Sequence, residues 1–412
     1  MGITINGSSA AGNIDLGTNG TITDLAVGGL PDGVVDEGSL ASNAVTSGKI
    51  ASGATSDTLS HRNLLINGEM MVDQRGDNSS NTGNAFGGPD RWYWLGGADA
   101  TCNTRQGGAT DLAGFPRQYK VSVGTADTSI SAGNYVVLRQ LIEGRNVQAI
   151  QKGFSSAKQL TLSFWLRMTN ATGVYTCELR DSDNNRHCCK QFTVSDGNWN
   201  KYTLTFPADT TGKLTDDNTA SLEVQFWLTA GTDYTSGTLQ TTWATFNSAN
   251  ANRAAGQTGN FVGSTSNVLE LTGVQLEVGS TATDYEHRAY SDELARCQRY
   301  YFMESGDYGV WMNPGMAQDS TDMYFFVNFP VPMRSNPSYT AEDVNIRLYG
   351  ADASDAFGAH GLAVIHQNTT AASGGGCTSS WLYKSGTSIT AGQAGVMQAM
   401  ADGVKLQFSA EL

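Results

Sequence analysis

The sequence predicts a mainly β protein with an extended Gly-rich N-terminal stem, an antiparallel, jelly-roll-like β-sandwich, a short helix and a smaller C-terminal β domain. Three observations lead to this prediction. Charged residues make up only 16% of the 412 residues and Gly numbers 48, whereas an ordinary soluble domain is roughly 25% charged. β-branched and aromatic residues gather in short segments divided by turn residues. Almost no segment carries the i, i+3, i+4, i+7 apolar stripe of a long helix.

Residues 1–61 are predicted to form the stem, which anchors and trimerises the chain. Apolar side chains recur there at every fifth position, namely at Leu25, Leu30, Val35, Leu40, Val45 and Ile50. A period of five fits neither a helix nor a strand, but it suits short extended pieces reset by Gly. One such line on a single chain buries almost nothing, so we predict a homotrimer that buries it along a shared axis. The alternative is a flexible Gly/Ser linker with a chance repeat.

Residues 62–290 are predicted to form the sandwich, which starts with the segment NLLINGEMMVDQRG. About eight short β-rich segments follow, separated by turn residues. In LTLSFWLRM, the apolar side chains at positions 160, 162, 164 and 166 share one face of a strand, and Trp165 and Arg167 share the other. Segments of this kind at this spacing indicate an antiparallel sandwich or jelly roll.

Residues 291–303 are predicted to form a short linking helix, with Ser291 or Asp292 as its cap and acidic residues in its first turn. Residues 304–412 contain further β-rich segments and are predicted to form a smaller distal domain, the tip. Polar stretches around residues 352–359 and 369–378 interrupt that domain. Loops of this kind on a rigid β scaffold often carry binding surfaces.

Charge and cysteine content exclude several classes of function. The formal net charge is −14 and no cluster of Lys and Arg offsets it, so a nucleic acid is not expected as a partner. No run of 18 apolar residues and no signal-peptide pattern are present, so no membrane span and no export signal are expected. The six cysteines form no C-x-x-C motif, so we expect free thiols and no zinc.

Several segments resemble a known family. NLLINGEMMVDQRG, GPDRWYW and GVQLEVGSTATDYEHRAYSDELARCQRYY are similar to the carbohydrate-binding-module-like sandwich of bacteriophage tail fibres, over residues 63–301. FPVPMRSNPSYT and LQFSAEL resemble the distal domain of such fibres, and VVDEGSLASNAVTSGKIASGA resembles their virion-proximal repeats. The resemblance implies a homotrimeric virion appendage whose N-terminal part docks on the particle and whose distal part faces the host. We expect the N-terminus to dock on a tail, baseplate or adaptor protein and the β domains to recognise a host surface glycan. Because no signal peptide is visible and the cysteines are expected to be free, we also expect the chain to be made in the host cytoplasm.

Aromatic side chains are the first candidates for contact with a sugar, because a flat π-face complements the apolar face of a pyranose. Tyr93, Trp165 and Trp381 are the glycan-stacking candidates. Trp92 and Trp94 would share one face of a strand, with Tyr93 on the other. We favour the interpretation in which these two tryptophans fill the core and Tyr93 lies at the surface.

Asp355, Phe357 and His360 are candidates for ligand contact in a distal loop. His287, within DYEHR, is expected to have a hydrogen-bonded role in closing the domain. The segment DSDNNR begins like a calcium-binding loop, but its sixth position is Arg186 and its twelfth is Phe192. We therefore interpret it as a polar hairpin tip, and the question of a structural calcium ion stays open.

No metal-binding histidine spacing, nucleotide-binding loop or nucleophile motif is present, so we expect neither a cofactor nor catalysis. A receptor-binding fibre is the preferred hypothesis. One alternative is a structural capsid or tail appendage without a receptor role. The other is a tailspike that cleaves polysaccharide, which would need two carboxylates about 5–10 Å apart.

Overall fold

The computed structural model describes residues 61–412, except for residues 109, 247–251, 343, 349–355, 358–362, 370–376, 385–390, 393 and 400–401. The predicted stem line therefore lies outside the described residues, as do Asp355 and His360. Every strand pair in the described part of the chain is antiparallel, and the fold is mainly β, as predicted.

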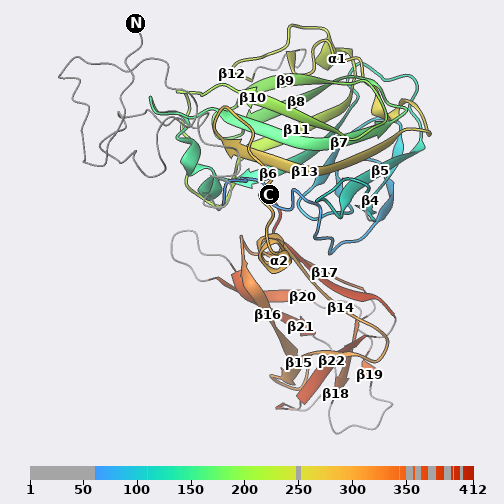
Figure 1. The fold of residues 1–412 in the computed structure, drawn as a ribbon. Helices are drawn as coiled ribbons and strands as arrows, with labels where there is room; N and C mark the ends of the chain where they lie inside the picture. Colours follow the sequence, from blue (N-terminus) through green and yellow to red (C-terminus); the bar gives the residue numbers. More distant parts are fainter. Residues whose placement is uncertain are drawn as a thin grey trace, which may run out of the picture. The chain divides into compact units, whose positions relative to one another are not determined.

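Two sheets form the sandwich (Figure 1). Sheet A contains, in spatial order, β1 (Asn78–Asn81), β4 (Thr101–Gly107), β5 (Gln118–Thr125), β13 (Val268–Val278), β7 (Leu160–Thr169) and β10 (Asn200–Phe206). Sheet B contains β12 (Ala244–Thr245), β9 (Arg186–Val194), β8 (Gly173–Asp181), β11 (Ala220–Ala230), β6 (Tyr135–Glu143), β3 (Tyr93–Gly96) and β2 (Ala85–Phe86). The short helical elements of this domain are η3 (Gly144–Asn146), η4 (Gln148–Ile150), α1 (Thr232–Thr235) and η6 (Phe261–Gly263).

The core lies between the two sheets and follows the alternation of their strands. On β7, the apolar side chains at alternate positions are buried, and Phe164 is fully covered. Trp92 and Trp94 are also buried, against Phe226 and Phe261 respectively. The predicted core role of both tryptophans is therefore confirmed. Strands β11 and β13 are buried along both faces, so other segments must cover their outer sides.

The segment DYEHR closes the sandwich onto its first residues. The backbone N–H of Asn63 donates to Glu286 Oε2 at 2.8 Å, and Arg288 Nη1 donates to the carbonyl of Leu65 at 3.0 Å. His287 Nδ1 lies 3.1 Å from Glu69 Oε2. The hydrogen-bonded role predicted for His287 is confirmed, because its segment joins the two ends of the domain.

Helix α2 (Tyr290–Gln298) differs from the prediction in its cap. Neither Ser291 nor Asp292 caps it; the N-cap is Ala289, which makes no side-chain cap hydrogen bond. The carbonyl of Ala289 instead accepts the N–H groups of Asp292 and Glu293. The Glu293 carboxylate accepts the N–H of Asn67 in the opening segment. The acidic first turn thus serves tertiary contact, which outweighs the local capping preference.

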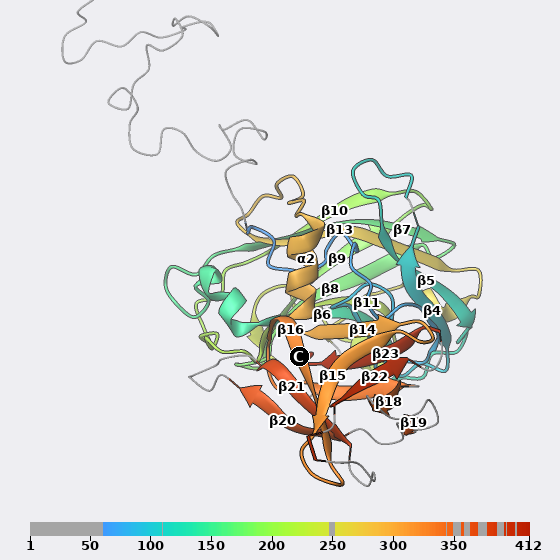
Figure 2. The same cartoon turned by 90° about the horizontal axis from the view of Figure 1, so that it is seen from below.

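The distal domain begins directly after this helix and has two sheets. Sheet C contains β14 (Tyr301–Gly306), β23 (Val404–Ser409) and β17 (Ser338–Glu342). Sheet D contains β19 (Ala356–Phe357), β18 (Val344–Leu348), β22 (Ala394–Ala399), β15 (Trp311–Ala317), β16 (Met323–Met333), β21 (Cys377–Lys384) and β20 (Ala363–Thr369). The predicted helix 291–303 was therefore too long, because its last residues start β14. Helix α2 contacts β14 and β16 (Figure 2).

Charged side chains join the distal domain to the sandwich. Glu143, at the end of β6, accepts from Arg299 Nε at 2.9 Å and from the Tyr300 hydroxyl at 2.8 Å. Arg75 Nη2 donates to Glu411 near the C-terminus at 2.9 Å.

All six cysteines are buried and free, as predicted. No helix of the described residues is long and apolar enough to cross a membrane.

Candidate functional site

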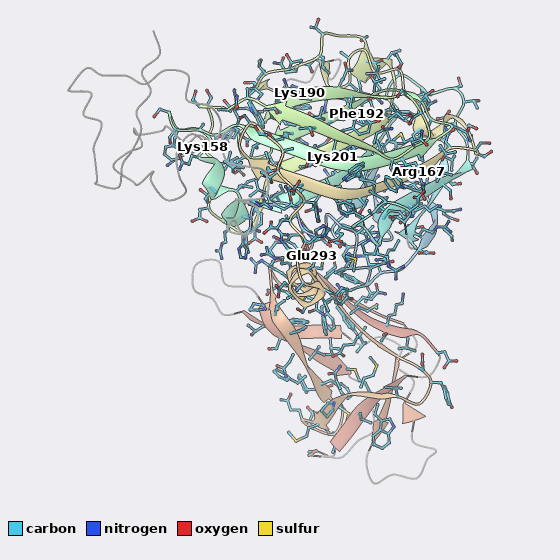
Figure 3. The ribbon with its side chains drawn as sticks, in the orientation of Figure 1. Lys158, Arg167, Lys190, Phe192, Lys201 and Glu293 are labelled. Atoms are coloured by element: carbon cyan, nitrogen blue, oxygen red, sulfur yellow. The ribbon has the colours of Figure 1, made fainter. Side chains whose placement is uncertain are left out.

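The outer face of sheet A carries two tryptophans and a group of polar side chains. Trp165 and Arg167 alternate with core residues on β7, so both point away from the core and are half-buried. Lys201 on β10 lies opposite Trp165 in the strand register and is exposed. Arg167 and Lys201 are labelled in Figure 3. Trp199 precedes β10 and is also half-buried, so four side chains from two neighbouring strands and their ends share one surface.

Ionic contacts fix the position of Arg167 and Trp199 on this face. Arg167 Nη1 donates to both oxygens of Asp111, at 2.9 and 3.1 Å, and its Nε donates to Glu270 at 2.6 Å. The Arg167 guanidinium carbon lies 4.9 Å from the Trp199 ring centre, and the Trp199 indole N–H donates to Asp111 at 2.8 Å. The tryptophan ring is therefore held at its edge and on one face.

The carboxylates of this face are held in the ionised form. The hydrogen bond from Trp199 is the main reason that the pKa of Asp111 lies below its ordinary value. Burial would raise the pKa of Glu270, but hydrogen bonds from Arg167 and Lys120 outweigh it and lower that pKa. Hydrogen bonding to Glu270 in turn raises the pKa of Arg167. Neither carboxylic acid is therefore a proton donor near neutral pH.

A glycine positions the Trp165 ring. Gly273 lies at a bulge of β13 with a φ of 59°, and a Cβ built there would stand 2.7 Å from Phe115 Cε1 and 3.1 Å from Trp165 Cδ1. Changing Gly273 to alanine is therefore expected to displace both rings and to lower the free energy of unfolding by about 1–3 kcal/mol. Urea unfolding followed by tryptophan fluorescence measures this. An unchanged midpoint and emission maximum would contradict it.

Tyr93 lies on the opposite side of the sandwich, on the outer face of sheet B. The Tyr93 ring packs edge-on against Phe86, with 4.8 Å between the two ring centres. The guanidinium carbon of Arg139 lies 5.1 Å from the centre of the Tyr93 ring. Arg139 Nη1 donates to Glu223 at 3.2 Å. Trp165 and Tyr93 therefore belong to two separate surfaces and do not form one site.

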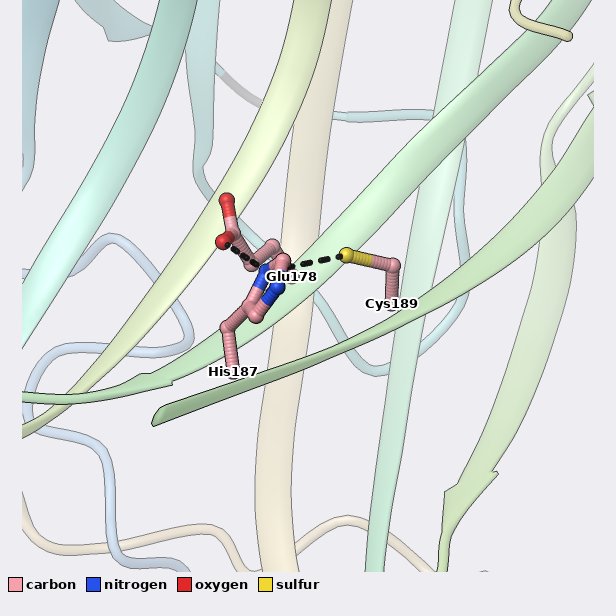
Figure 4. Close-up of side chains that lie close together, drawn as sticks. All are labelled: Glu178, His187 and Cys189. Atoms are coloured by element: carbon pink, nitrogen blue, oxygen red, sulfur yellow. Dashed lines mark hydrogen bonds and ion pairs between the residues drawn. The ribbon is translucent and has the colours of Figure 1, made fainter. Parts of the chain in front are cut away.

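The segment between β11 and β13, which contains α1 and β12, covers part of sheet B. Its Arg253 donates through Nη2 to Glu178 Oε2 at 2.8 Å, and the Trp227 indole N–H donates to the same oxygen at 2.9 Å. His187 Nδ1 lies 2.9 Å from the other oxygen of Glu178, and Cys189 Sγ lies 3.8 Å from the same nitrogen (Figure 4). Three side chains therefore contact the Glu178 carboxylate, which is fully buried.

Glu178, His187 and Cys189 have the donor atoms of a metal site, and these atoms lie within 4.8 Å of one another. Their chemistry fits a hydrogen-bonded ion pair instead. Burial would raise the pKa of Glu178, but the charge of Arg253 and the hydrogen bonds of His187 and Arg253 lower it to about 2. Burial raises the pKa of the Cys189 thiol well above its ordinary value, so the neutral thiol is the favoured form beside Glu178. A divalent cation would also be repelled by the Arg253 guanidinium.

The segment DSDNNR forms a hairpin tip, as predicted, and its first residue belongs to a buried ionic cluster. Asp181, at the end of β8, forms an ion pair with the buried ammonium of Lys152. That ammonium also lies 2.9 Å from Asp209 Oδ2, and it donates to the carbonyls of Thr211 at 2.9 Å and Gly212 at 3.1 Å. Four oxygens therefore surround one nitrogen. Sequence reasoning missed this cluster and the Glu178 cluster, since their members are far apart along the chain.

The distal candidates fall in different places. Trp381 is in β21, at the register position opposite Phe326 of β16 and His366 of β20. Phe357 belongs to strand β19 and is paired with Ile346, so it does not lie in a loop as predicted. Nothing in the described residues brings these positions together with Tyr93 or Trp165.

No protein-family model matches the chain, and no curated protein matches it in sequence. Solved structures are similar over about half of it. The enzymatically active domain of bacteriophage CBA120 tailspike protein 4 is 13% identical; the match covers 52% of this chain and 21% of that one, with a TM-score of 0.26. A putative sugar binding protein from Bacteroides thetaiotaomicron is 15% identical, with 53% of this chain and 100% of that one covered and a TM-score of 0.28.

A family 11 carbohydrate-binding module from Clostridium thermocellum, in complex with a mixed-linked tetrasaccharide, is 13% identical. The match covers 52% of this chain and all of that module, with a TM-score of 0.25. This chain therefore spans about a fifth of the tailspike and the whole of the two smaller proteins. The strand order and the shared core identify residues 61–289 as a β-sandwich.

Proposed function

We propose that the protein is a receptor-binding fibre of a virus particle, and that the outer face of sheet A binds a glycan of the host surface. The observation that carries the proposal is that Trp165, Arg167 and Trp199 share the outer face of two neighbouring strands, on which Lys201 is also exposed. Flat aromatic rings with fixed polar groups beside them are the chemistry that recognises a pyranose. The tail-fibre motifs in residues 63–301 support the assignment to a virion.

The geometry favours binding over cleavage. A glycosidase needs one carboxylic acid that is protonated at the working pH. On this face the pKa values of Asp111 and Glu270 are both lowered, by Trp199 and Arg167 among others. The two carboxylates orient cations and indole instead of donating a proton. We therefore propose that the protein holds the glycan without hydrolysing it, and release of reducing ends from host glycan would contradict this.

Assembly into a trimer would allow a weak contact with the glycan to attach the particle to the host. In the proposed homotrimer, which docks on the particle through residues 1–61, three identical faces act together. Several fibres on one particle raise the effective concentration further, so a millimolar single-site affinity becomes firm attachment. The competing hypothesis is a structural appendage, for which no glycan binding is expected.

The decisive test uses the full chain and purified host surface glycan. Trp165→Ala and Trp199→Ala are each expected to weaken binding about tenfold, because each removes one stacking platform. Tyr290→Ala is the matched control: it removes an exposed aromatic ring of helix α2 and is expected to leave the dissociation constant unchanged. Isothermal calorimetry gives the constants. Wild-type affinity in both tryptophan variants would move the site away from sheet A, and Tyr93→Ala would then test the opposite face.

A further inference from the structure

In the part of the chain whose burial is described, large apolar side chains are exposed mainly within one short segment. Eight are exposed among the described residues, and five of these lie in residues 308–326 of the distal domain. Met316 of β15 has 61% of its surface exposed and Phe326 of β16 has 40%. Exposed large apolar residues scattered singly need no explanation, but Met316 and Phe326 lie on paired strands and line one depression, and contiguous exposed apolar residues mark a surface that is covered in use.

Over residues 323–327 the strand β16 is apolar on both of its faces. Met323, Phe325 and Val327 point inward and are buried in the distal core. Tyr324 and Phe326 alternate with them on the outer face, where a strand of a one-sided antiparallel sheet normally carries polar residues. Neighbouring strands are consistent with this pattern, because Met316 of β15 lies opposite Tyr324 in the register. Strands that are apolar on both faces belong to sheets covered on both faces.

The outer face of sheet D also contains a depression. The depression, of about 790 Å³, lies over β15 and β16, and none of the described side chains that line it is charged. Its polar side chains are only those of Gln318 and Tyr324. A sugar-binding pocket needs several directed hydrogen-bonding groups, which this surface does not supply. We call this surface, formed by Pro314, Met316, Gln318, Tyr324 and Phe326, the distal apolar face.

We propose that the distal apolar face packs against a second copy of this chain. The inference deepens the proposed function, since it names a subunit contact of the proposed homotrimer. Each copy carries a net charge of −14, so copies repel one another wherever carboxylates meet. Contact between them is favourable where carboxylates are missing, and the residues described in the lining of this face include none. Asp319 and Asp322 lie in the adjoining turn, at the rim, where interfaces are normally polar.

The experiment measures self-association of the full chain by sedimentation and the oxidation of Met316 by dilute peroxide. The double variant M316S/F326S is expected to raise the dissociation constant at least about tenfold, as for central interface residues. The matched control F154S/V278S removes two side chains of similar exposure from the sandwich. It should leave the dissociation constant of self-association unchanged. In the wild-type assembly, Met316 should be oxidised several-fold more slowly than in the urea-unfolded chain.

Oxidation decides the case in which the stem alone keeps the copies together. Then F326S leaves the mass unchanged, but Met316 should become oxidised faster than in the wild-type assembly. A wild-type chain that stays monomeric, or an assembly in which Met316 reacts as fast as in the unfolded chain, overturns the proposal. So does protection that appears only when host glycan is added. Glycan binding measured through Trp165→Ala is a separate readout, so failure of one proposal is distinguishable from failure of the other.

Discussion

Replacing Glu178 with leucine is expected to lower the free energy of unfolding by about 3–5 kcal/mol, because the change leaves a buried guanidinium without its anion. Arg253 donates to Glu178 through both Nε and Nη2, at 2.8 to 3.1 Å. The indole N–H of Trp227 and the ring of His187 would lose the same partner. Urea unfolding of the full chain measures the loss, and a loss below about 1 kcal/mol would mean that water replaces the carboxylate.

The double variant E178L/R253M is the control for this interpretation. Replacing both members of a buried ion pair with apolar residues is often close to neutral, so the double variant should be clearly more stable than E178L alone. The effect also depends on pH. Since folding lowers the pKa of Glu178 from 4.5 to about 2, its contribution is complete above pH 4.5 and is lost as the pH falls toward 2. The difference between wild type and E178L should therefore shrink in acid.

Replacing Lys152 with methionine is expected to cost a similar amount, about 3–5 kcal/mol, since two buried carboxylates would lose their shared cation. Asp181 and Asp209 are 0% and 7% exposed, so water cannot readily take the place of the ammonium. Burial would raise the pKa of Asp209, and hydrogen bonds from Arg186 and Lys152 outweigh it and lower that pKa. Without Lys152, part of this lowering is lost.

Lys158→Met is the matched control, because Lys158 is an exposed lysine in the same segment (Figure 3). Its replacement should change stability by no more than about 0.5 kcal/mol. Thermal unfolding of both variants at pH 7 and pH 5 compares them. If the two variants unfold at the same temperature, the contacts between the Lys152 ammonium and its four oxygens make no net contribution to the stability of the fold.

Much of the fold could be predicted from alternation within single segments. The two faces of β7 and the core position of Trp92 and Trp94 follow from the parity of apolar residues along the chain. The hairpin tip at DSDNNR follows from turn-forming residues between two β-rich segments. These features are local, so the sequence specifies them without knowledge of the partners.

Features that depend on pairing across the sandwich could not be predicted. Parity places Tyr93 and Trp165 at the surface, but only the strand order shows that they belong to opposite sheets. Glu178 and Arg253 are 75 residues apart, and nothing local to either residue indicates the other. The predicted cap of α2 was wrong because the helix begins at Tyr290, which places Ser291 and Asp292 inside its first turn.

The sequence carries one further signal in MYFFVNF. Its odd positions are all apolar and its even positions include Tyr324 and Phe326, whereas a strand with one solvated face should alternate. Read for both faces, this segment indicates a strand that is covered on two sides. The candidates Asp355, Phe357 and His360 were instead chosen because they lie in polar stretches, which indicate exposure but not the chemistry of contact.

The Lys152 ammonium has a consequence for the handling of this protein. An oxygen-lined cage filled by a dissociable ion empties when the medium is dilute or contains a chelator. Here the cation is part of the polypeptide, so its local concentration is fixed by the covalent chain and does not vary with the surroundings. The hairpin tip at the end of β8 should therefore keep its shape in seawater, in soil water and in a chelating buffer alike.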